Sequence, residues 1–120
     1  GVVGRNEHAQ SEIEKALIVE APKSGYEEKC YYFDVNEKGG KARAGIFNPD
    51  VMRGVVLSYD KSELAKFTEW QMFGKTDYVL GLEPGNCLPD GRDILREKGI
   101  LEFLNPGEEK EFKLKFVFEG

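Results

Sequence analysis

A single carboxylate, Glu83, closes a short run of residues that alternates like a β-strand. The alternation divides the run between a core-like face of Tyr78, Leu80 and Leu82 and a second face of Val79, Gly81 and Glu83. Gly81 leaves room beside the acid for another group to approach the sheet, and Pro84 is expected to stop the strand directly after it. A carboxylate presented at such a rim can take up a proton or accept hydrogen bonds. The residues alone equally suit a strand-end acid that bonds its neighbours or meets solvent.

Two side chains on the preceding strand are candidates for ligand binding, Trp70 and Gln71. Trp70 could stack on the apolar face of a ligand or anchor the sheet, and Gln71 offers a donor and an acceptor for hydroxyl groups. Only one of them can share a face with Glu83. One hairpin register places Trp70 opposite Gly81, and a slip of one residue places Gln71 there. The turn over residues 74–77 favours the Trp70 register.

The loop after Glu83 is rich in backbone-bending residues and contributes Asn86 and Arg92 as further candidates. Arg92 could bind a carboxylate or phosphate of a ligand, but loop arginines usually pair locally, and three acids lie nearby in the sequence: Asp90, Asp93 and Glu97. We therefore favour a structural role for Arg92. Asn86 is expected to shape the turn rather than to touch a ligand.

Other chemistry is not supported by the residue spacing. Cys87 has no histidine close in sequence to activate it as a nucleophile, and His8, the only histidine, sits in a polar leader where we expect it to be solvated. The histidine and cysteines lack zinc-ligand spacing, the acids do not form a calcium-loop pattern, and no glycine-rich phosphate loop opens a helix. We expect neither a metal nor a cofactor.

Composition limits the classes of partner that we expect the protein to bind and the cellular compartment in which we expect it. The chain has 120 residues, enough for one small domain, and a formal net charge of −5. An acidic surface without a basic stripe argues against nucleic acid and anionic membranes as partners. No apolar run approaches 18 residues, so no membrane span is predicted. Two dispersed cysteines make no disulfide framework, which favours a reduced, cytoplasmic protein.

Short alternating or β-branched segments separated by turns predict an all-β fold, an antiparallel β-sandwich or part of one. Residues 1–16 are polar and unpatterned, so we interpret them as a linker or ragged edge before an ordered part over residues 17–120. A short helical turn is expected over residues 90–98. Strands are predicted over residues 26–35, 41–47, 54–59, 64–73, 78–83, 100–104 and 110–118.

The last predicted strand alternates strictly, with Lys113 and Lys115 outward and four apolar side chains inward: Phe112, Leu114, Phe116 and Phe118. If the chain is cut from a larger sandwich, these side chains or a free sheet edge would be exposed. We therefore expect the isolated chain to self-associate.

The run from Gly81 to Arg92 (GLEPGNCLPDGR) resembles aldose-1-epimerase-like proteins of the galactose mutarotase superfamily, especially an uncharacterised bacterial branch. Further matches are Phe67–Met72, Arg96–Leu101 and Leu104–Glu108, and the resemblance covers roughly residues 20–118. Because such proteins are considerably longer β domains, it implies that the chain is the C-terminal part of a mutarotase-like supersandwich.

The resemblance implies a sugar ligand and a role for Glu83 as the general base that takes the proton from the anomeric hydroxyl. In this family a histidine protonates the ring oxygen, and that histidine would belong to the part of the domain preceding this chain. The family also has a substrate-binding glutamine on the strand before the base. Pro84 departs from the polar residue typical of the family, which puts the identity of the sugar in doubt.

Three functions remain open at this point. The first is an aldose-1-epimerase-like protein in which Glu83 supports anomeric interconversion of an aldose. The second is a carbohydrate-binding protein of the same fold without turnover, and the third is an inactive fragment. They differ in whether a general acid faces Glu83, and that residue is not identified in this sequence.

Overall fold

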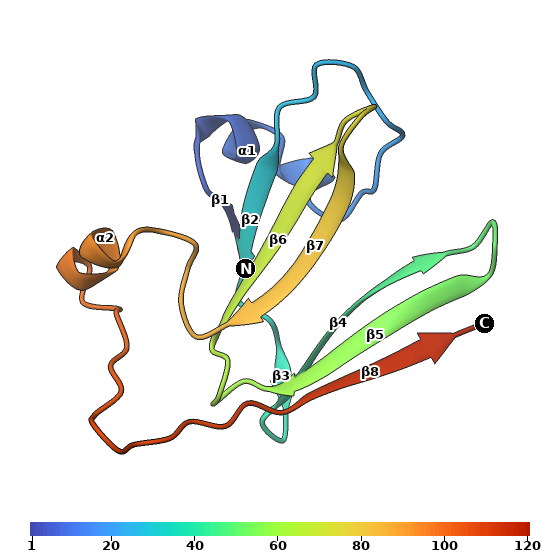
Figure 1. Cartoon of the computed structure of the whole chain (residues 1–120). Coiled ribbons are helices and arrows are strands. Elements are labelled where there is room, and N and C mark those ends of the chain that lie inside the picture. Colours follow the sequence, from blue (N-terminus) through green and yellow to red (C-terminus); the bar gives the residue numbers. More distant parts are fainter. The chain divides into compact units, whose positions relative to one another are not determined.

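The computed structural model describes all 120 residues and divides them into two compact units, each carrying a four-stranded sheet (Figure 1). The first unit combines Gly1–Asp34 with Phe67–Glu83, and the second combines Val35–Lys66 with Pro84–Gly120. The strands pair antiparallel in both sheets: β1 with β2, β2 with β6, β3 with β4, β4 with β5 and β5 with β8. The predicted all-β, antiparallel class is confirmed.

The sheet of the first unit has the order β1-β2-β6-β7. Its strands are β1 (Val2–Gly4), β2 (Lys29–Phe33), β6 (Lys66–Phe73) and β7 (Tyr78–Gly85). A tight turn joins β6 to β7, closed by a hydrogen bond of 3.0 Å from the Gly74 amide to the Asp77 carbonyl. β7 runs over Pro84, two residues beyond the predicted end at Glu83. Because β7 is an edge strand, the missing N–H of proline costs no internal ladder bond.

The N-terminal residues are folded, so the prediction of a linker over residues 1–16 is wrong. They form β1, the helix α1 (Glu7–Ser11) and a 3₁₀ turn, η1 (Ile13–Lys15). The Asn6 side chain caps α1 by accepting a hydrogen bond of 2.9 Å from the Ala9 amide. Ala9 and Ala16 are buried against Tyr31 of β2. Val2 and Ile13 pack against the same cluster. A few small or single apolar side chains in elements this short give no periodic pattern in the sequence.

The sheet of the second unit has the order β3-β4-β5-β8. Its strands are β3 (Glu37–Lys38), β4 (Lys41–Asn48), β5 (Arg53–Asp60) and β8 (Leu114–Glu119). The turn between β3 and β4 is Gly39-Gly40, with positive φ angles of 60° and 82° that suit glycine. The helix α2 (Arg92–Glu97) lies within the predicted helical turn and is followed by Gly99, whose φ is also positive. Neither helix is long and apolar enough to cross a membrane.

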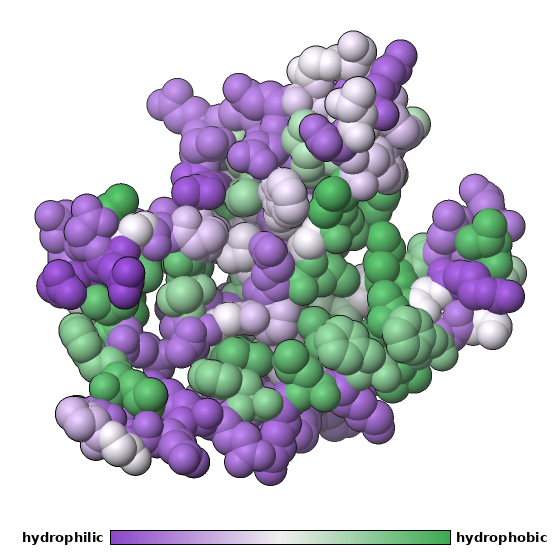
Figure 2. Space-filling view, viewed as in Figure 1, coloured by the Kyte–Doolittle hydropathy of each residue, from purple (hydrophilic) through white to green (hydrophobic).

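Two predicted strands differ from the structure. Residues 100–104 form no strand, and the final strand begins at Leu114 rather than at residue 110. The register of β4, β5 and β8 puts one set of side chains on a common face of the second sheet. Apart from the polar pair Asn48 and Arg53 at one end, that face is apolar: Ala42, Ala44, Ile46, Val55, Leu57, Tyr59, Leu114, Phe116 and Phe118. Figure 2 shows apolar side chains gathered over this sheet. Burial decreases toward the β8 edge, from 2% exposure at Tyr59 to 82% at Phe118.

Candidate functional site

Glu83, Gly81 and Trp70 meet on one face of the first sheet. A methyl group added at Gly81 would place its carbon 3.3 Å from the Trp70 Cβ atom, 3.3 Å from the Glu83 Cδ atom and 3.4 Å from Glu83 Oε1. The predicted placement of Trp70 beside Gly81, on the Glu83 face, is therefore confirmed. Glu83 is exposed and Trp70 half-buried. A Cβ atom at Gly81 would thus be crowded by the Glu83 carboxylate and by the base of the Trp70 side chain, so glycine lets these two side chains come together over the strand.

The Trp70 ring is held in place by an acid that directly precedes β2. Its Nε1 donates a hydrogen bond of 2.7 Å to Glu28 Oε2, and Cys30, two residues further on, is the cross-strand partner of Trp70. The hydrogen bond fixes the ring plane without occupying its faces. An indole oriented in this way is suited to stacking against a flat apolar surface.

The same face carries charges of both signs. Burial raises the pKa of the Cys30 thiol, and the negative charges of Glu28 and Glu83 raise it further, whereas a hydrogen bond with the Arg5 side chain lowers it. The net shift is upward from an ordinary value of 9.0, so the thiol stays protonated at neutral pH. Carboxylates that accept and a guanidinium that donates give this face the means to bind hydroxyl groups.

Sequence reasoning missed three members of this face: Arg5, Glu28 and Cys30. The alternation over residues 26–35 places Glu28 and Cys30 on the same side of their strand, so a signal for these two was present. Arg5 lies in the segment interpreted as a linker and carried no signal. The Arg5 amide also donates a hydrogen bond of 3.0 Å to the Cys30 carbonyl, which ties the N-terminal segment to β2.

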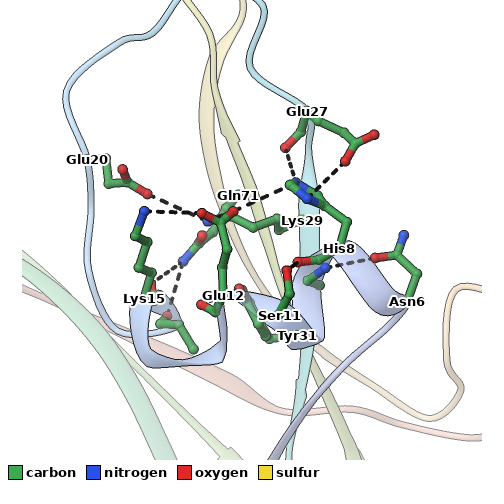
Figure 3. A network of polar contacts seen from close by, with 12 residues as sticks. Asn6, His8, Ser11, Glu12, Lys15, Glu20, Glu27, Lys29, Tyr31 and Gln71 are labelled. Carbon is green, nitrogen blue, oxygen red and sulfur yellow. Dashed lines mark hydrogen bonds and ion pairs between the residues drawn. The ribbon is translucent and has the colours of Figure 1, made fainter.

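Gln71 lies on the opposite face of β6 and is fully buried. Its Nε2 donates to the carbonyls of Lys15 and Ala16 at 3.2 and 3.1 Å and to Glu69 Oε1 at 3.3 Å (Figure 3). The alternative register, which would place Gln71 on the face of Glu83, is wrong, because Gln71 points to the side of the sheet that the folded N-terminal segment covers. The side chain anchors that segment instead.

A buried lysine organises the covered face around Gln71. Lys29, the cross-strand partner of Gln71, is 1% exposed, and its Nζ lies 3.4 Å from Glu12 Oε2 and 3.6 Å from Glu20 Oε1. Figure 3 shows these side chains gathered beside the N-terminal segment. Burial raises the pKa of Glu69, on the same face, to about 7. These groups serve the packing of α1 and η1 onto the sheet.

The sequence led us to expect a solvated His8, but in the structure its ring lies close to two carboxylates. Its Nδ1 lies 3.0 Å from Glu27 Oε2, and its Nε2 lies 3.9 Å from Glu12 Oε2. The ring is half-buried on α1. The only imidazole of the chain is thus engaged by carboxylates of the N-terminal segment and of the stretch before β2.

Asn86 and Arg92 belong to the second unit. Asn86 is half-buried in the loop after β7, and no side-chain hydrogen bond ties it to that loop. Arg92 is exposed at the start of α2 and forms none of the local ion pairs expected for it; Asp90 pairs with Lys98 at 3.8 Å. No group of three or more histidine, cysteine or acidic side chains is arranged to hold a metal ion.

Comparison with known proteins places the chain in a family and matches its fold. A family model described as a domain of unknown function (DUF4432) matches residues 1–117. A crystal structure of a candidate aldose 1-epimerase from Klebsiella pneumoniae subsp. pneumoniae aligns with a TM-score of 0.90 at 21% sequence identity. The alignment covers 98% of this chain but 32% of that one, so the chain spans about a third of the length of the matched structure. Comparison with curated proteins gives no match. The chain has an aldose-1-epimerase-like fold and belongs to the DUF4432 family.

Proposed function

We propose that the chain forms the C-terminal part of a sugar-binding, aldose-1-epimerase-like domain in which Glu83 is the general base. One observation carries the proposal: Glu83 and Trp70 lie together over Gly81 on one face of the sheet. A carboxylate beside an aromatic ring is a suitable pair for a sugar, because the ring stacks on C–H groups while the acid accepts from a hydroxyl. The likeness in fold to a candidate aldose 1-epimerase supports the same ligand class.

In the proposed reaction, Glu83 takes the proton from the anomeric hydroxyl of an aldose. The ring C–O bond breaks, the ring oxygen is protonated by a general acid, and the carbonyl formed can be attacked from its other face when the ring closes. The proton then returns, so the reaction is an isomerisation without net consumption of a reactant. The general acid would come from the part of the domain that lies outside this chain.

Trp70 would hold the sugar beside the base. The hydrogen bond from its Nε1 to Glu28 keeps the ring fixed before a ligand arrives, so little side-chain freedom is lost on binding. Trp70→Ala is expected to weaken sugar binding by about 1–2 kcal/mol through lost aromatic contact. Trp70→Phe keeps an aromatic face and is expected to retain most of the affinity.

The test is a titration of the chain with a panel of aldoses. Because Trp70 is the only tryptophan, its fluorescence reports on this face alone. We expect at least one aldose to shift or quench the emission, and ligand-observed NMR to show the affinity falling in Trp70→Ala but not in Trp70→Phe. If every aldose leaves the emission unchanged, this face is not a sugar site in the chain by itself.

A second candidate is sugar binding without turnover. The observation that favours it is the engagement of His8 by Glu27, which leaves this imidazole committed to a structural contact. The two functions are separated by anomer-exchange NMR on any sugar that binds: binding without accelerated exchange identifies a binding protein.

We further propose a cytoplasmic protein that binds no nucleic acid, consistent with two free cysteines and a net charge of −5.

A further inference from the structure

The strand β8 forms one edge of the second sheet. It pairs with β5 on one side, and the strand order ends at β8 on the other (Figure 1). All six of its residues are exposed. An edge of this kind offers a row of backbone donors and acceptors to any strand of matching pattern.

The charged side chains of β8 are placed so that two antiparallel copies of the strand can pair a positive side chain with a negative one. Lys115 and Glu119 lie on one face with Val117 midway between them. Their neighbours on β5 are Ser58 and Gly54, which are uncharged, and neither charge forms an ion pair within the chain. Both charges are therefore available to a partner strand.

We propose that β8 pairs antiparallel with β8 of a second copy of this chain, in the register centred on Val117. This register sets Lys115 opposite Glu119 of the second copy, twice by symmetry, on one face. On the other face it sets Phe116 opposite Phe118 twice. Cross-strand pairs of opposite charge and of aromatic rings are the side-chain contacts that stabilise antiparallel sheets. The result is a closed, twofold pair with one continuous eight-stranded sheet.

Neighbouring symmetric registers fit less well. Centring the pair on Phe118 sets Glu119 against Val117 and leaves Lys115 without a charged partner. Centring it on Phe116 sets Lys115 against Val117 and requires Lys113 to meet Glu119. Lys113 lies before β8, and its amide is already bonded to Glu63 Oε1 at 2.9 Å. The register centred on Val117 satisfies both charges of the strand.

Charge reversal tests the register directly, with the 120-residue chain studied by sedimentation equilibrium over a range of concentrations. We expect a monomer–dimer equilibrium in the parent chain. Lys115→Glu alone and Glu119→Lys alone each create two like-charge pairs, and each should weaken the dimer by about tenfold or more. The double reversal Lys115→Glu/Glu119→Lys restores both pairs and should recover the parent dissociation constant.

Lys113→Glu is the matched control, because it makes the same charge change on the same face one repeat outside the paired region. It should leave dimerisation unchanged, and circular dichroism should show every variant folded alike. A chain that stays monomeric throughout overturns the proposal. So does a double reversal that remains as weak as the single variants, and so does a Lys113→Glu variant that is weakened as much as Lys115→Glu.

Discussion

Glu69 and Glu83 lie on the neighbouring strands β6 and β7 in opposite surroundings, and only Glu83 is exposed. Glu69 is 6% exposed, on the face covered by the N-terminal segment, and burial raises its pKa to about 7. Glu83 is exposed on the other face, beside Trp70. A pKa near neutrality is often taken as a mark of an acid–base catalyst. Here it marks a packed carboxyl group, whereas the proposed base, Glu83, is the accessible one of the two acids.

The raised pKa of Glu69 predicts a pH dependence of stability. Between its ordinary value of 4.5 and about 7, the folded chain binds more protons at this site than the unfolded chain does. The free energy of unfolding should therefore fall as pH rises through that window, by at most about 1.4 kcal/mol for each unit of pKa difference. Urea unfolding at several pH values measures the slope.

Glu69→Gln should remove this contribution while keeping an oxygen that accepts from Gln71. The exposed Glu37→Gln serves as the control and should leave the slope as in the parent chain. A Glu69→Gln variant that loses stability over the same window as steeply as the parent would show that another group is responsible.

At the scale of elements, the docking of α1 onto β1 depends on the absence of a side chain at Gly4. A methyl group there would lie 2.4 Å from the Gln10 amide nitrogen and 2.8 Å from the Ala9 carbonyl carbon, which are backbone atoms that cannot swing aside. The Gly4 amide also donates to Gln10 Oε1 at 2.8 Å. The covered face of the first sheet therefore relies on this close approach.

Gly4→Ala should accordingly destabilise the first unit by about 1–3 kcal/mol, the usual range for an overpacked site. Gly1→Ala is the matched control, because a methyl group at Gly1 meets nothing within 4 Å. Thermal unfolding of the two variants side by side makes the comparison. Equal melting temperatures would mean that α1 does not pack on β1 as described.

Strands with strong alternation were the part of the fold open to prediction from sequence. The segments that became β4, β5, β6 and β7 were placed within a few residues, and the faces of Trp70, Gly81 and Glu83 followed from counting by twos. The N-terminal segment was missed because α1 has five residues and only one of them, Ala9, is buried. Residues 100–104 are apolar except for Glu102 but pair with no strand, and a run of this kind becomes part of a sheet only by pairing with another strand.

Only the part of the candidate site that lies within one hairpin could be predicted from the sequence. Alternation relates residues on the same or adjacent strands, so it linked Trp70 to Glu83 through the β6–β7 turn. Arg5 reaches Cys30 by a contact between distant segments, which no local pattern encodes. The burial of Gln71 likewise depends on the carbonyls of Lys15 and Ala16, more than fifty residues away in sequence.

At the scale of the whole molecule, the apolar face of the second sheet remains largely open toward the β8 edge. Leu114, Phe116 and Phe118 are 48%, 57% and 82% exposed. Contiguous apolar surface of this kind usually marks an interface. Since the chain spans about a third of the matched structure, we propose that the rest of a larger β domain covers this face.

The 120-residue chain should therefore bind a hydrophobic dye such as anilinonaphthalene sulfonate more strongly than a typical folded monomer does. Pairing through the β8 edge leaves the face itself in solvent, so dimerisation should not abolish dye binding. Phe116→Ser/Phe118→Ser should reduce the dye fluorescence, and Val117→Ser, on the opposite face, should not. Dye fluorescence at the level of a compact control protein would show that the face is closed.

The most direct test of the central claim is anomer-exchange NMR on a protein that carries this chain together with the rest of its domain. If Glu83 is the general base, Glu83→Gln should preserve the fold and sugar binding while slowing anomeric interconversion by roughly 100-fold or more. Glu37→Gln, an exposed acid of the second sheet, should exchange at the parent rate. Interconversion that is equally fast in the parent and in Glu83→Gln would contradict the claim.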